Sequence, residues 1–95
     1  MPLIVWSQEA ENDLIEIISF IGERNPIAAE KLGKSIKDSA LPLSEHPMVF
    51  KQSDRMPGCR EIVVSPNYIV VYQVGIDLIE VLRVLHARQE YPMPR

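Results

Sequence analysis

The chain has 95 residues, 46% of them hydrophobic and 24% charged, and its formal net charge at pH 7 is −3. This is the composition of an ordinary soluble globular protein, and the length suits one domain spanning residues 1–95. The longest apolar runs are only a few residues, which excludes a membrane span and the core of a signal peptide. We therefore expect a cytoplasmic protein without membrane contact.

The two halves of the chain differ in charge. Residues 1–50 contain eight acidic and four basic side chains, whereas residues 51–95 contain five acidic and six basic ones. Because nucleic-acid affinity depends mainly on Lys and Arg that neutralise phosphates, any contact with a polyanion should use the second half. The chain as a whole is poorly equipped for such contact. The single cysteine, Cys59, is interpreted as a small hydrophobic residue rather than a nucleophile.

A strand and a helical hairpin are predicted in the first half. Residues 3–6, LIVW, are typical of a strand, and Ser7 follows as a helix N-cap. The first turns of this helix carry three acidic residues that complement the helix dipole, namely Glu9, Glu11 and Asp13. Helical periodicity continues to Gly22, and a second helix begins at Asn25 and reaches Pro42 near its frayed end. The short turn between the helices predicts an antiparallel hairpin.

The second half is predicted as a loop followed by three strands. Residues 46–58 are loop-like, with prolines, Gly58 and scattered polar residues. Three segments rich in Val, Ile and Tyr follow, at residues 60–65, 68–74 and 78–85. Their connections are short enough for hairpins, so we expect an antiparallel meander.

The last predicted strand should lie inside the sheet, because both of its faces are largely apolar. Strict alternation places on one face Leu78, Glu80, Leu82 and Val84. The predicted fold class is α+β, in the order β-α-α-β-β-β, with an antiparallel sheet and a helical hairpin packed on one face. The position of the first strand in the sheet stays open.

Three separated segments resemble one known family. The opening WSQEAENDLIEIISFIGERNPIAAEKL is similar to the helical hairpin of the RelE/ParE superfamily of bacterial toxins. The segments PGCREIVVSPNYIVVYQV and VLRVLHARQEYP resemble the C-terminal sheet of that superfamily. The resemblance implies the growth-inhibiting toxin of a type II toxin–antitoxin module, of the kind linked to plasmid stabilisation. It also implies two alternative activities: RelE-like toxins cut mRNA in the ribosome, and ParE-like toxins block DNA gyrase without chemistry of their own.

The nuclease alternative needs an acid or base and cations on the phosphate. The resemblance would assign the acid–base role to His86 and the phosphate clamp to Arg60 and Arg83. Tyr91 would then stack on a base, and positive charge would come from the loop residues Lys51 and Arg55. The same arginines could instead pair with carboxylates of the sheet, and His86 could be a structural hydrogen-bonding residue.

The gyrase alternative is favoured by the sequence pI of about 5.3 and by the absence of a dense lysine and arginine cluster. The ending LHARQEYP also looks more ParE-like than RelE-like. We therefore predict a ParE-like gyrase inhibitor. Its expected target-binding residues are Arg83, His86, Arg88, Tyr91, Lys51 and Arg55. A third hypothesis is a superfamily member that has lost toxicity and survives as a partner-binding protein.

The resemblance also predicts a cognate antitoxin as partner. The edges of the sheet and the outer face of the helical hairpin are its expected docking surfaces, by strand addition or helix-in-groove contact. Operator DNA should be reached only through the antitoxin, because the chain has no recognition-helix motif. Two distant histidines and one cysteine give no metal-ligand spacing, so no metal or other cofactor is expected.

Overall fold

The computed structural model describes residues 2–88, and its elements follow the predicted order. They are β1 (Leu3–Trp6), α1 (Gln8–Gly22), α2 (Pro26–Ser39), the 3-10 helix η1 (Leu41–Ser44), β2 (Arg60–Ser65), β3 (Tyr68–Val74) and β4 (Leu78–His86). The α+β class is confirmed. The second helix ends as an α-helix at Ser39, earlier than the apolar pattern suggested, because Pro42 cannot donate to an α-helical ladder.

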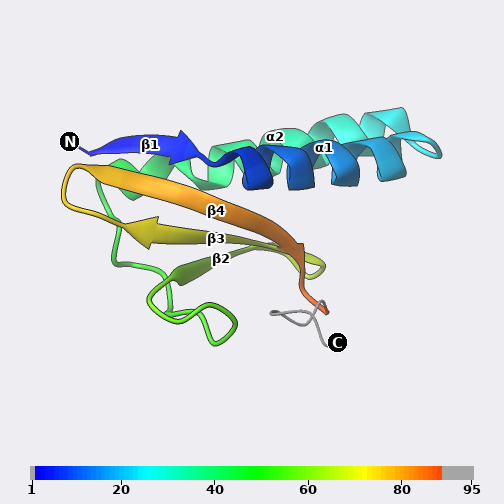
Figure 1. The fold of residues 1–95 in the computed structure, drawn as a ribbon. Helices are drawn as coiled ribbons and strands as arrows, with labels where there is room; N and C mark the ends of the chain where they lie inside the picture. The colour runs from blue at the N-terminus through cyan, green and yellow to red at the C-terminus, as the bar shows by residue number, and fades with distance from the viewer. Residues whose placement is uncertain (1, 89–95) are drawn as a thin grey trace.

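The sheet has four strands in the order β1-β4-β3-β2 (Figure 1). β2 pairs with β3 and β3 pairs with β4, both antiparallel, so the predicted meander is confirmed. β4 lies inside the sheet, as its two apolar faces predicted. β1 pairs in parallel with β4, so the strand whose position the sequence left open makes the sheet mixed. β1 and β2 are the two edge strands.

The helical hairpin covers one face of the sheet (Figure 1). Ser7 caps α1 by accepting a hydrogen bond from the backbone N–H of Ala10 at 3.0 Å, and Asn25 caps α2 in the same way. The helices approach closely at Gly33, where an added Cβ atom would lie 2.8 Å from the side chain of Ile18. Among the helices in the described part of the chain, none is long and apolar enough to cross a membrane.

Hydrophobic residues form a cluster on each face of the sheet. The cluster under the helices consists of Ala10, Leu14, Ile36, Ala40, Leu43, Ile62, Val70, Tyr72, Ile79, Val81 and Val84. The cluster on the other face consists of Cys59, Ile69, Val71 and Leu85. The interpretation of Cys59 as a buried hydrophobic residue is confirmed, and burial raises the pKa of its thiol.

One irregularity in β4 corrects the predicted strand faces. The register between β3 and β4 shifts once and leaves Leu82 as an extra residue, a β-bulge. Strict alternation placed Val84 on the face of Leu78, opposite Ile79 and Val81, and this was wrong. Val84 packs in the cluster under the helices, while Leu85 packs in the other cluster. The bulge therefore re-aims the last residues of β4, and the groove described below lies there.

Candidate functional site

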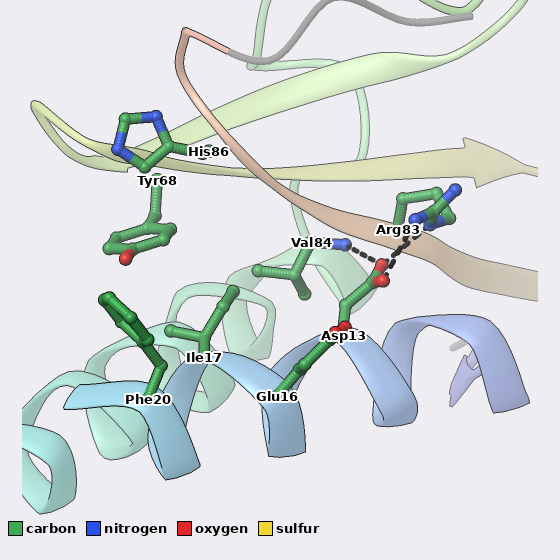
Figure 2. A pocket seen from close by; sticks show the side chains of 8 residues that line it. All are labelled: Asp13, Glu16, Ile17, Phe20, Tyr68, Arg83, Val84 and His86. Carbon is green, nitrogen blue, oxygen red and sulfur yellow. Dashed lines mark hydrogen bonds and ion pairs between the residues drawn. The ribbon is translucent and has the colours of Figure 1, made fainter. Parts of the chain in front are cut away.

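A groove of about 420 Å³ lies between α1 and the ends of β3 and β4 (Figure 2). Its lining side chains are Asp13, Glu16, Ile17, Phe20, Tyr68, Arg83, Val84 and His86. Phe20 is 70% exposed, so this wall offers apolar surface to solvent. The groove combines carboxylates, aromatic rings and aliphatic surface in one concave site, as binding sites commonly do.

A fork-shaped ion pair forms one end of the groove. Arg83 donates from Nε to Asp13 Oδ2 at 2.7 Å and from a terminal nitrogen to Asp13 Oδ1 at 2.9 Å. The backbone N–H of Val84 donates to the same carboxylate at 3.0 Å. Charge-assisted bidentate contacts of this kind are among the strong hydrogen bonds of proteins. The pair ties α1 to the bulged part of β4, and a phosphate would have to compete with Asp13 for Arg83.

His86 stands at the other end of the groove as the last residue of β4. Its ring packs edge-on against Tyr68, with ring centroids 5.3 Å apart. Its Nδ1 accepts a hydrogen bond from the backbone N–H of Arg88 at 3.1 Å, so the neutral ring carries its proton on Nε2. His86 thus holds the start of the segment that follows β4, in addition to lining the groove.

Arg60 does not join His86. Arg60 pairs with Tyr72 and His86 pairs with Tyr68, on opposite sides of β3. Four residues along a strand span about 13 Å. Arg60 instead donates to the backbone carbonyl of Phe50 at 2.7 Å and holds the loop that precedes β2. The predicted catalytic set of His86, Arg83 and Arg60 is therefore brought together only in part, as His86 and Arg83.

A second ion pair lies where the loop meets β2. Arg55 donates to Glu61 Oε2 at 3.0 Å, and Ser53 donates to the same oxygen at 2.7 Å. The side chain of Glu61 is only 1% exposed. Burial alone would raise the pKa of Glu61, but the hydrogen bonds from Ser53 and Arg55 and the charges of Arg55 and Lys51 outweigh it and lower this pKa.

The remaining predicted target-binding residues have separate positions. Lys51 is 63% exposed and its Nζ lies 3.7 Å from Glu61, too far for a strong contact. Arg88 is exposed and follows directly after the groove. Tyr91 lies outside the described residues. In the described part of the chain, no three His, Cys, Asp or Glu side chains gather as a metal site would require.

Two activities were predicted for this region, binding of a protein surface and acid–base chemistry on RNA, and the arrangement bears on both. RNA cleavage needs cations on the phosphate beside the proton-transferring group. His86 shares its groove with Asp13 and Glu16, and Arg83 is engaged by Asp13. The exposed aromatic side chain of Phe20 is of the type that anchors protein partners.

Sequence reasoning missed much of the groove wall, namely Asp13, Glu16, Phe20 and Tyr68. Asp13 was interpreted only as a partner of the helix dipole. Its spacing held a further signal, because it lies three residues after Ala10 and four before Ile17, on the border of the face of α1 that meets the sheet. A carboxylate at such a position needs a partner.

Known toxins match the sequence of this chain over nearly its whole length. The family model described as "ParE toxin of type II toxin-antitoxin system, parDE" matches residues 4–91. Toxin RelE2 from Caulobacter vibrioides is 34% identical over 87 residues, which cover 92% of this chain and 97% of that protein. The "Putative toxin Y4kP" from Sinorhizobium fredii is 32% identical over 90 residues, which cover 94% of this chain and 92% of that protein.

A solved structure shows the same fold. It is that of the "Chromosomal ParDE TA system from P. aeruginosa", which superposes with a TM-score of 0.81 at 21% identity. The match covers 90% of this chain and 96% of that one.

Proposed function

The chain belongs to the ParE toxin family of type II toxin–antitoxin systems, within the RelE/ParE superfamily, and from this premise we propose that it inhibits DNA gyrase by binding. One observation carries the proposal. A nuclease would direct its arginines at phosphate, whereas the candidate arginines of this chain bind oxygen atoms of the protein itself. Arg83 and Arg55 contact carboxylates, and Arg60 contacts a backbone carbonyl. Releasing any of them would break charge-assisted hydrogen bonds.

The groove and the residue beside it supply the proposed contact surface for gyrase. Phe20 gives an exposed aromatic anchor, and Tyr68 and His86 extend the aromatic surface. Arg88 adds an exposed cation next to the groove. Tyrosine and arginine are among the residue types that carry most of the energy in protein interfaces, and phenylalanine is enriched there. Lys51 and Tyr91 stay in the proposed surface as predictions from the sequence.

The test uses the purified toxin in gyrase supercoiling and DNA-cleavage assays. The proposal predicts inhibition of supercoiling and no cleavage of mRNA in translating ribosomes. If gyrase is untouched while ribosome-bound mRNA is cut, the gyrase proposal is wrong.

The second candidate is a ribosome-dependent mRNA endonuclease, favoured by the presence of His86 and Arg83 in one groove. In that case His86→Gln should abolish cleavage, because it removes the proton-transferring group. The third candidate, a member without toxicity, predicts normal growth when the chain is expressed without an antitoxin. Arrested growth would reject it.

We further propose that a cognate antitoxin pairs with the free edge of β1. The two edges of the sheet differ in accessibility. The start of β2 is paired with the loop that precedes it, because Gln52 and Arg60 form an isolated β-bridge. β1 carries no charged residue, and its Leu3 and Val5 are 71% and 41% exposed. An uncharged edge strand with exposed apolar residues is suited to strand addition.

A lysine on the exposed surface of β1 tests the antitoxin proposal. Val5→Lys should weaken antitoxin binding about tenfold or more, roughly 1.4 kcal/mol, because a charge would have to be accommodated at the added strand. Ile76→Lys is the matched control, because Ile76 is 97% exposed in the turn before β4. Equal affinity for both variants would place the antitoxin elsewhere.

Two further parts of the proposal concern DNA and location. Operator DNA is proposed to be bound through the antitoxin, and the cytoplasm is the proposed location of the toxin.

A further inference from the structure

Three hydrogen bonds fix the point at which the chain leaves the sheet. The N–H of Ala87 donates to the carbonyl of Asn67 at 2.6 Å. The carbonyl of Ala87 accepts from a terminal nitrogen of Arg55 at 2.7 Å. The N–H of Arg88 donates to His86 Nδ1 at 3.1 Å. Ala87 is therefore held from both sides, by the turn between β2 and β3 and by a residue of the loop before β2.

The guanidinium of Arg55 contacts Glu61 and Ala87 at the same time. One terminal nitrogen donates to both carboxylate oxygens of Glu61, at 3.0 and 3.3 Å, while the other donates to Ala87. The carboxylate of Glu61 is buried in β2 and cannot turn toward solvent. The planar guanidinium has fixed donor directions, so fixing one nitrogen on Glu61 aims the other.

The backbone around Arg55 is fixed as well. Ser53 Oγ donates to Glu61 and accepts from the N–H groups of Arg55 and Met56, each at 3.1 Å. The N–H of Ser53 donates to the carbonyl of Cys59 at 2.8 Å. These hydrogen bonds hold the loop against the start of β2, next to the carboxylate of Glu61. The backbone that carries Arg55 is therefore held in place by the same residues that bind its ion-pair partner.

We infer that Arg55 is a positioning residue, which bridges buried Glu61 to the Ala87 carbonyl and so fixes the direction in which Arg88 leaves the sheet beside the groove. The inference rests on the proposed function, since the position of Arg88 matters for gyrase only if this end of the molecule contacts it. Arg55 then acts through Arg88 and not by touching the target. This replaces the direct target-binding role that the sequence suggested for Arg55.

The main test variant removes the bridge without leaving a buried charge. Arg55→Met alone would strand the Glu61 carboxylate, so the double variant Arg55→Met with Glu61→Gln replaces the pair by neutral side chains of similar size. Such replacements are often close to neutral for stability. The double variant Lys34→Met with Asp38→Asn is the matched control, because it also neutralises one ion pair, on the exposed side of α2. Arg55→Lys is a second variant that keeps the charge but lacks the two-armed fork.

Two measurements are made on each variant: amide hydrogen exchange of the full chain, and the concentration that half-inhibits gyrase supercoiling. In the double variant we expect exchange at Ala87 and Arg88 to be at least about tenfold faster, with β3 amides unchanged. Half-inhibition should need at least about tenfold more toxin, and adding Arg88→Ala should then have less than about a twofold effect. Arg55→Lys should shift both readouts in the same direction, and the control variant Lys34→Met with Asp38→Asn should shift neither.

Unchanged exchange at Ala87 and Arg88 in both Arg55 variants overturns the inference. Faster exchange with unchanged inhibition also overturns it, because Arg88 would then need no positioning. If the wild-type chain does not inhibit gyrase, the proposed function fails, and the exchange at the two amides decides by itself whether Arg55 holds this segment.

Discussion

Two arginine–carboxylate pairs link elements of the fold, and they differ in how much water reaches the carboxylate. The Asp13–Arg83 pair joins α1 to β4, and its carboxylate and guanidinium side chains are 13% and 21% exposed. The Glu61–Arg55 pair joins β2 to the loop; its carboxylate side chain is only 1% exposed, whereas its guanidinium side chain is 27% exposed. The first pair has the shorter closest contact, 2.7 Å against 3.0 Å.

The comparison shows that contact length does not decide which pair matters more for stability. If its arginine is lost, a partly exposed carboxylate regains water, but a dry one stays unsolvated. The Glu61 pair should therefore be the costlier one to break, even though its contact is longer. In both pairs, an arginine that could bind phosphate binds a carboxylate of the protein instead, and so links two parts of the fold.

The largest expected effect follows from removing Arg55. Arg55→Met leaves the Glu61 carboxylate buried with Ser53 as its close partner, and should lower the free energy of unfolding by about 2–4 kcal/mol. Urea unfolding measures this value. Lys34→Met, which breaks an exposed pair on α2, is the control and should stay within about 0.5 kcal/mol. A loss as small as that of the control would show that Glu61 is reached by water.

Removing Arg83 should cost less. Arg83→Met should lower the free energy of unfolding by about 1–2 kcal/mol, because Asp13 keeps the N–H of Val84 and gains water. Comparison with Asp13→Asn and with the double variant gives the coupling energy of the pair. If Arg83→Met destabilises more than Arg55→Met, the role assigned to burial in this comparison is wrong.

An exposed groove residue should affect binding rather than stability. Phe20→Ser should weaken inhibition of gyrase about tenfold, equivalent to roughly 1.4 kcal/mol, with little change in unfolding. Ile27→Ser is a matched control, because Ile27 is 69% exposed at the start of α2 and does not line the groove. Equal inhibition by the two variants would remove the groove from the proposed gyrase surface.

The smallest effect is a pH dependence carried by Glu61. Its pKa in the folded chain lies below the ordinary value of 4.5, so its ionised form stabilises the fold. This contribution is complete above about pH 4.5 and is lost as the pH falls through the lower, folded-state pKa. The Tm of the wild type should therefore fall more steeply than that of Glu61→Gln as the pH is lowered below about 4.5. Parallel curves would contradict a depressed pKa.

Periodicity and turn residues were enough to predict the two α-helices and four strands of this fold, but not the 3-10 helix η1. They could not place β1, because the four residues of LIVW contain nothing that distinguishes parallel from antiparallel pairing. They also could not predict the bulge at Leu82, because β4 is apolar on both faces and a one-residue shift leaves the pattern unchanged.

The candidate site was predictable only for its part on β4. Arg83 and His86 were predicted from their residue types, and both line the groove. The partner of Arg83 was not predictable, because Asp13 lies 70 residues away in the sequence and charge alone does not select it. Arg55 was predicted to be a target-binding residue of the loop, and only the fold reveals its hydrogen bond to the carbonyl of Ala87, 32 residues further along the chain.

The most direct test of the central claim compares the wild type with His86→Gln in a gyrase supercoiling assay, alongside mRNA cleavage in translating ribosomes. A toxin that acts by binding should inhibit gyrase in both forms. The variant should differ by less than about tenfold, because one contact among several is altered. Neither form should cut mRNA. Cleavage of mRNA by the wild type, lost in His86→Gln, with gyrase fully active in both, would contradict the account.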